Sequence, residues 1–172
     1  MKKIKIGKTR KRRRNEYKTN YSKRLNLLKG GFPRIVFRKS NRYITVQLVK
    51  SVNAQDKVDF GLTSKKLLEY GWPKDVNNSL KNIPAVYLTG YLFGKKIHEK
   101  KIGKVSFDMG LIRNVHKSKV YALIKGLKDA GISITNKEKI FPEEKRIMGE
   151  HLKDENIIKK LKEIKTKIEG EK

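Results

Sequence analysis

Alternating apolar and polar positions between residues 33 and 62 predict three short strands. The first two, Pro33–Lys39 and 43–48, are separated by polar turn residues and predict an antiparallel hairpin. The third covers 58–62. One face of these strands is aliphatic, and the other is predicted to expose Arg34, Arg38, Thr45 and Gln47.

Apolar residues spaced three and four positions apart predict the helices. A short helix capped by Ser64 stops at Gly71, with Trp72 filling the edge of the core, and a long one runs from Pro84 to about Lys101. Another helix follows Ser118 and stops at Gly131, and an amphipathic helix covers 154–169. Further strands are expected at 105–107 and 132–134.

The order of these elements predicts an α/β domain, a mixed sheet that starts with an antiparallel β-hairpin and has helices packed on it. Gly90 and Gly94 lie four positions apart on one face of the long helix. We expect this pair to let the helix approach the sheet closely.

Charge divides the 172 residues into three parts. Twelve of the first 24 residues are Lys or Arg, opposed only by Glu16, while residues 136–172 carry 11 basic and 9 acidic residues. This favours a basic arm at 1–31, an α/β body at 32–135 and a mixed-charge extension at 136–172. So dense a run of like charges is expected to be extended in water, with Gly30 and Gly31 as a flexible joint to the body.

A net charge of +27 indicates a polyanionic partner: nucleic acid, an anionic membrane or an acidic protein. No run reaches the roughly 18 apolar residues that span a bilayer, which disfavours a membrane. The chain has no cysteine, and its three histidines have no metal-ligand spacing. We expect no metal or other cofactor, and no small-molecule substrate because nucleotide-binding glycine motifs are absent.

Three segments have the chemistry of a nucleic-acid contact. In the arm, Tyr17 and Tyr21 either stack on bases or anchor the arm to its own domain. The hairpin tip at 38–43 combines cations with small polar groups, which suits phosphate contact but also an ordinary turn. The loop at 113–117 precedes a helix, where Ser118 either caps the helix or helps to bind an anion.

A catalytic alternative is a carboxylate nuclease of ribonuclease-H-like layout, since Asp108 ends a strand. The first strand disfavours it, because arginines occupy the place of the leading acid. A histone-like DNA-binding protein is the other alternative. We therefore expect a protein that is not an enzyme.

The chain resembles the archaeal and eukaryotic branch of the large-subunit ribosomal protein L18 family over nearly its whole length. The resemblance is carried by Tyr21–Leu25, by Pro33–Arg42 and above all by the string FRKSNRYITVQLV. Leu68–Trp72 matches a segment that bacterial members lack. The short C-terminal extension favours the archaeal type.

This resemblance implies a structural, cytoplasmic protein of the large ribosomal subunit that binds 5S rRNA. It implies anchoring to 23S rRNA in the central protuberance, beside the ribosomal protein L5 family and other proteins of that region. The residues expected to bind RNA are Lys8, Arg10, Lys11, Arg12, Arg13, Arg14, Tyr17, Lys18, Tyr21, Lys23, Arg24, Arg34, Arg38, Lys39, Ser40, Asn41, Arg42, Tyr43, Arg113, His116, Lys117 and Ser118.

Overall fold

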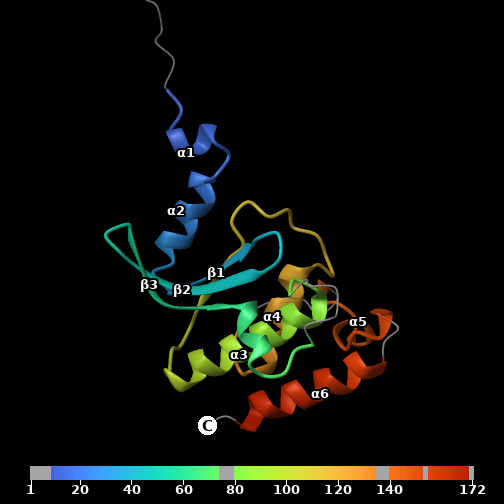
Figure 1. The fold of residues 1–172 in the computed structure, drawn as a ribbon. Helices are drawn as coiled ribbons and strands as arrows, with labels where there is room; N and C mark the ends of the chain where they lie inside the picture. Colours follow the sequence, from blue (N-terminus) through green and yellow to red (C-terminus); the bar gives the residue numbers. More distant parts are fainter. Residues whose placement is uncertain (1–8, 74–79, 135–139, 153–154, 171–172) are drawn as a thin grey trace, which may run out of the picture.

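A computed structural model describes residues 9–73, 80–134, 140–152 and 155–170, and within them a sheet lies between two sets of helices (Figure 1). The arm contains α1 (Arg12–Asn15) and α2 (Tyr21–Lys29). On the other side of the sheet lie α3 (Ile83–Glu99) and α4 (Lys119–Asp129), with α6 (Glu155–Gly170) beyond them.

The sheet has the strand order β3-β2-β1-β4. Strands β1 (Arg34–Lys39), β2 (Ile44–Val52) and β3 (Gln55–Thr63) form an antiparallel meander, and β4 (Ser106–Asp108) pairs with β1 in parallel. The mixed α/β architecture predicted from the sequence is therefore confirmed. The predicted strand at 132–134 is wrong, because these residues follow the turn at Gly131 without joining the sheet.

The apolar face of the sheet packs on α3. Side chains of β1 and β2 that alternate along the strands, Ile35, Phe37, Ile44, Val46 and Leu48, are almost completely buried. Phe60 of β3 lies against Phe93 of α3, with ring centroids 4.8 Å apart. Burial of such side chains contributes roughly 1.5–3 kcal/mol each, so this layer stabilises the fold substantially.

Helices α3 and α4 cross at very short distance because glycines lie at the crossing. A Cβ atom at Gly126 would lie 2.3 Å from the Tyr87 carbonyl oxygen, and one at Gly90 would lie 2.5 Å from that of Leu123. A Cβ at Gly94 would meet the Ala130 side chain. The prediction that Gly90 and Gly94 face the sheet is wrong, since their close neighbour is α4.

A short 3-10 helix, η1 (Ser64–Leu68), follows β3. Thr63, rather than Ser64, stands at its cap position, and Ser64 Oγ instead accepts a hydrogen bond from the backbone N–H of Ile44 at 3.1 Å. The predicted capping role of Ser64 is therefore wrong. Trp72 is buried at this edge, as predicted.

The C-terminal part packs back onto the body. It contains α5 (Glu144–Ile147), the short helix η3 (Glu150–Leu152) and α6. Leu161, Ile164 and Ile168 on α6 are buried in the common core. Lys95 Nζ on α3 donates to two carbonyl oxygens near the end of α6, each at 2.7 Å, which satisfies groups that a helix end leaves unpaired.

Candidate nucleic-acid interface

The basic arm is partly helical rather than extended throughout. All residues from Arg10 to Arg14 are exposed, and Lys8 lies outside the described residues. Local contacts favour helix here: Arg12 pairs with Glu16 four residues on at 3.1 Å, and Arg13 Nε donates to Thr19 Oγ1 at 2.9 Å. Asn20 caps α2 by accepting from the Lys23 backbone N–H. Such contacts offset part of the repulsion that predicted an extended chain.

The two arm tyrosines have different surroundings. Tyr17, in the turn between α1 and α2, is 85% exposed and has a positive φ of 50°. Tyr21 is half-buried, and Lys11 Nζ lies 4.6 Å from the centroid of its ring. The Tyr21 ring thus contacts another residue of the arm, whereas Tyr17 presents its ring to solvent, and neither contact ties the arm to the body.

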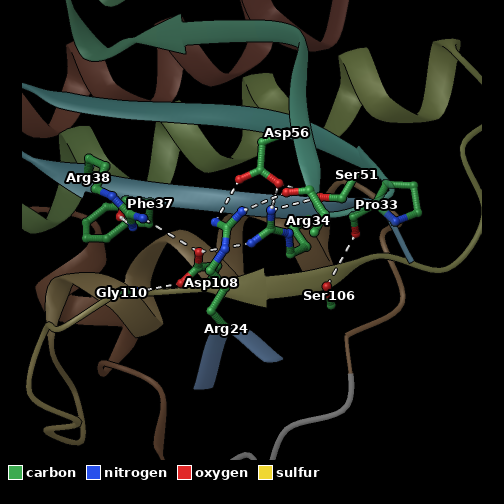
Figure 2. A network of polar contacts seen from close by, with 11 residues as sticks. Arg24, Pro33, Arg34, Phe37, Arg38, Ser51, Asp56, Ser106, Asp108 and Gly110 are labelled. Carbon is green, nitrogen blue, oxygen red and sulfur yellow. Dashed lines mark hydrogen bonds and ion pairs between the residues drawn. The ribbon is translucent and has the colours of Figure 1, made fainter. Parts of the chain in front are cut away.

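An ion-pair network joins the arm to the sheet (Figure 2). Asp56 on β3 lies 2.8 Å from Arg24 Nη1 of α2 and 2.6 Å from Arg34 Nη2 of β1. Its Oδ1 also accepts from Ser51 Oγ at 2.6 Å. A second carboxylate, Asp108 at the end of β4, lies 3.7 Å from Arg34 and 3.6 Å from Arg38.

The expectation that Arg34 is exposed is wrong. Its side chain is only 3% exposed, because the guanidinium is enclosed between the two carboxylates and donates to Ser51 Oγ at 3.0 Å. A buried charge needs partners of this kind. Arg34 of β1 thus links β3 and β4 through ion pairs with Asp56 and Asp108.

The ionisation of Asp56 reflects the same network. Burial by itself disfavours the charged carboxylate, but hydrogen bonds from Ser51, Arg24 and Arg34 outweigh it and lower the pKa of Asp56 to about 2. The carboxylate is therefore charged at neutral pH, as its two arginine partners require.

The hairpin tip between β1 and β2 is exposed at Lys39, Ser40, Asn41 and Arg42. Ser40 closes the turn: its Oγ donates to the Tyr43 carbonyl oxygen at 2.9 Å and accepts from the Tyr43 N–H at 3.0 Å. Lys65 Nζ lies 4.6 Å from the centroid of the Tyr43 ring. The hydroxyl of Ser40 and the ring of Tyr43 are thus engaged within the chain, whereas the side chains of Lys39, Asn41 and Arg42 are exposed to solvent.

The loop before α4 is exposed from Arg113 to Lys117. Lys117 Nζ pairs with Glu143 at 2.6 Å, and the His116 ring lies edge-on to Tyr121. Ser118 stands at the cap position of α4, but its side chain makes no capping bond, and its Oγ is buried without a partner among the described residues.

The fold brings arm, tip and loop side by side. A cavity of about 130 Å³ is lined by arm residues together with Arg38 of β1 and Gly110 and Leu111 of the loop after β4. A second hollow, of about 310 Å³, is lined by Lys39 of the tip together with Arg113, Lys117 and Ser118 of that loop. The parallel pairing of β1 with β4 causes this arrangement, because it puts both strand ends at one edge of the sheet.

Two lysines near the tip and the loop were not among the residues predicted to bind RNA. Lys119 lines the second hollow, and Lys81 donates to the Asn41 carbonyl oxygen of the tip. Burial, and then the nearby charges of Lys39 and Lys81, lower the pKa of Lys119. Lys119 is the first residue of α4, a helix whose first turn contains no acid. The N-terminus of a helix favours acidic residues, so a lysine at this position, with no acid in the first turn, was the sequence signal that could have indicated an anion-binding site.

Among the described residues, no group of three or more His, Cys, Asp or Glu side chains is placed to hold a metal ion. Asp108, the acid that the nuclease alternative needs, is engaged by Arg34, Arg38 and the Gly110 N–H. Within the same part of the chain, no helix combines the length and apolar character needed to cross a membrane.

Comparisons with known proteins agree on one family. The family described as "Ribosomal large subunit proteins 60S L5, and 50S L18" matches residues 5–105. The large ribosomal subunit protein uL18 of Korarchaeum cryptofilum is 43% identical over 82% of this chain and 70% of its own length. The large ribosomal subunit protein uL18 of Methanothrix thermoacetophila is 41% identical over 83% of this chain and 82% of its own length.

The family match covers the arm from residue 5, strands β1 to β3 and α3, and it ends just before β4. The related proteins are components of the large ribosomal subunit and are structural rather than enzymatic, as the sequence pattern predicted. With a family match over more than half of its length and archaeal relatives above 40% identity, the chain belongs to the L5/L18 family of large-subunit ribosomal proteins.

Proposed function

We propose that this protein binds 5S rRNA and helps to anchor it to 23S rRNA in the central protuberance, next to a ribosomal protein of the L5 family. The arm at 1–31 supplies affinity, the body at 32–135 fixes orientation, and the extension at 136–172 braces the body. The observation that carries the proposal is the set of cations from arm, tip and loop that line two hollows at one edge of the sheet.

Electrostatics supports a folded nucleic acid as the partner. Cations that neutralise phosphates release condensed counterions, which gives affinity that falls steeply with salt. The exposed ring of Tyr17 adds a surface on which an unpaired base can stack. A structured RNA offers both phosphates and unpaired bases, whereas duplex DNA keeps its bases paired.

The test is a binding series with 5S rRNA, transfer RNA and duplex DNA at several salt concentrations. An arm variant, Arg10→Ala with Arg14→Ala, removes two exposed cations. We expect at least tenfold weaker binding of 5S rRNA and a salt slope smaller by about two. The control, Lys159→Ala with Lys160→Ala on α6, removes equal charge far from the interface and should change affinity less than about twofold.

Equal affinity of the arm variant and the wild type would contradict the proposal, as would equal affinity for all three nucleic acids at one salt concentration. Anchoring is tested separately. Immobilised 23S rRNA should retain 5S rRNA only when the protein and its L5-family neighbour are present, and retention without this protein would exclude an anchoring role.

A further inference from the structure

Five of the eleven residues that line the cavity between arm and body are cations. Arg13, Lys18, Lys23 and Arg24 come from the arm, and Arg38 comes from β1. Asp108 is the single acid in its wall. Two of these cations are paired with acids outside the cavity, Lys18 with Glu16 at 2.9 Å and Arg24 with Asp56 at 2.8 Å. Arg13, Lys23 and Arg38 face the single carboxylate of Asp108, so the wall keeps a net positive charge, and such a cavity favours an anion.

Asp108 cannot neutralise these groups. Its Oδ1 accepts from the Gly110 N–H at 2.7 Å, and its Oδ2 is shared between Arg34 and Arg38 at 3.7 and 3.6 Å. Lys23 Nζ makes no ion pair within the described part of the chain, and Arg13 has only its Nε engaged, on Thr19. Donors of both residues therefore remain for a ligand.

The size of the cavity limits what it can hold. About 130 Å³ corresponds to about four water molecules in the liquid, which is room for a tetrahedral oxyanion with its ester oxygens. Thr19 and Asn20, which also line it, add neutral polar groups. Guanidinium groups match phosphate oxygens two at a time, so Arg13 of the arm and Arg38 of β1 suit such a ligand.

The missing side chain of Gly110 leaves room for Arg38 in the wall of the cavity. Its φ is +62°, and a Cβ atom there would lie 2.9 Å from Arg38 Nη1. Arg38 Nη1 also donates to its neighbouring carbonyl oxygen, that of Phe37, at 2.8 Å. A glycine in the loop and a backbone acceptor in β1 thus hold this guanidinium at the cavity before any ligand arrives.

We propose that this cavity binds a single phosphate group of the RNA, which bridges the arm and β1 and locks the arm in its docked position. This inference rests on the proposed function. Without RNA, Arg24 of the arm pairs with Asp56 and donates to the Ala54 carbonyl oxygen of the β2–β3 turn, and the bridging phosphate adds contacts from both sides. The locked arm then presents Tyr17 and the exposed arginines in a fixed direction.

The test replaces individual RNA phosphates by neutral methylphosphonates and measures binding to the full chain. We expect one position, or two adjacent ones, to weaken binding about tenfold, while the other arm contacts cost less than about threefold each. In the Lys23→Ala variant the large penalty at that position should fall below about threefold. Lys29→Ala, an exposed lysine on the same helix outside the cavity, should leave the penalty unchanged.

Equal small penalties at every position, or a large one that persists in Lys23→Ala, would overturn the inference while leaving RNA binding intact. Failure of the wild type to bind 5S rRNA would instead overturn the proposed function. A titration of the free protein with inorganic phosphate at constant ionic strength distinguishes an RNA phosphate from free phosphate as the ligand. Saturable shifts of the amide NMR signals of Thr19 and Gly110, together with equal small penalties at every methylphosphonate position, would indicate a site for free phosphate and refute an RNA phosphate.

Discussion

Replacing Asp56 by asparagine tests the network that joins arm and sheet. The substitution keeps the shape of the side chain but removes the charge that faces Arg34, whose side chain is 3% exposed. Removing one partner of a buried ion pair costs about 3–5 kcal/mol when the other charge is left alone. Here Asp56 is 32% exposed and Asp108 remains 3.7 Å from Arg34, so we expect a smaller loss, about 2 kcal/mol of unfolding free energy.

The pKa of Asp56 gives an independent magnitude. A fall from 3.8 to about 2 corresponds to about 2.4 kcal/mol, and solvent screening of a carboxylate that is one-third exposed reduces this to between about 1 and 2 kcal/mol. The unfolded carboxyl binds its proton near pH 3.8 and the folded one only near pH 2. The stabilisation is therefore complete above about pH 4 and is lost as the pH falls through 2.

The measurement is urea unfolding of the wild type and Asp56→Asn from pH 7 to pH 2. The control is Asp59→Asn on the same strand, whose carboxylate lies 3.4 and 3.8 Å from two exposed lysines and should cost less than about 0.5 kcal/mol. Equal losses for the two variants at pH 7, or a difference between wild type and Asp56→Asn that does not shrink below pH 4, would refute the reasoning.

Three further substitutions test the fold. Gly126→Ala should lower the free energy of unfolding in urea by at least about 2 kcal/mol, because the added methyl collides with the Tyr87 carbonyl oxygen. The control Gly103→Ala, whose methyl meets nothing within 4 Å, should not destabilise the protein, and equal effects of the two variants would contradict the close helix crossing. Ala54→Gly should stabilise by about 1 kcal/mol, since Ala54 has a φ of 64° in the β2–β3 turn, and a lower melting temperature would contradict this. Lys95→Met should cost about 1 kcal/mol and raise amide exchange in α6, whereas unchanged exchange would show that its bonds to α6 are dispensable.

The alternation of apolar residues predicted the strands well, because one face of the sheet is buried against α3. It failed at Arg34, which occupies the face predicted to be polar and exposed. The carboxylates that enclose Arg34 lie 22 and 74 positions further along the chain, on β3 and β4. No local pattern indicates that two such distant acids meet over the first strand.

The glycines of α3 show a similar limit. Their spacing indicated a close approach, and the structure confirms one, but the neighbour is α4 instead of the sheet. The available signal was Gly126, which lies within the apolar stripe of the following helix. In the arm, the density of charge predicted an extended chain and hid the local contacts of Arg12, Arg13 and Asn20 that favour helix.

Two groups of arginines in the arm and in β1 have different roles. Arg24 and Arg34 are paired with Asp56, and these pairs set the direction in which the arm leaves the sheet. Arginines further out, such as Arg10 and Arg14, have no ion pair among the described residues and remain for a partner. Because the same carboxylate holds both the buried arginine and the arm, loss of Asp56 should weaken RNA binding although it removes a negative charge. Simple electrostatics predicts tighter binding, so the sign of that change separates a docked arm from a free tether.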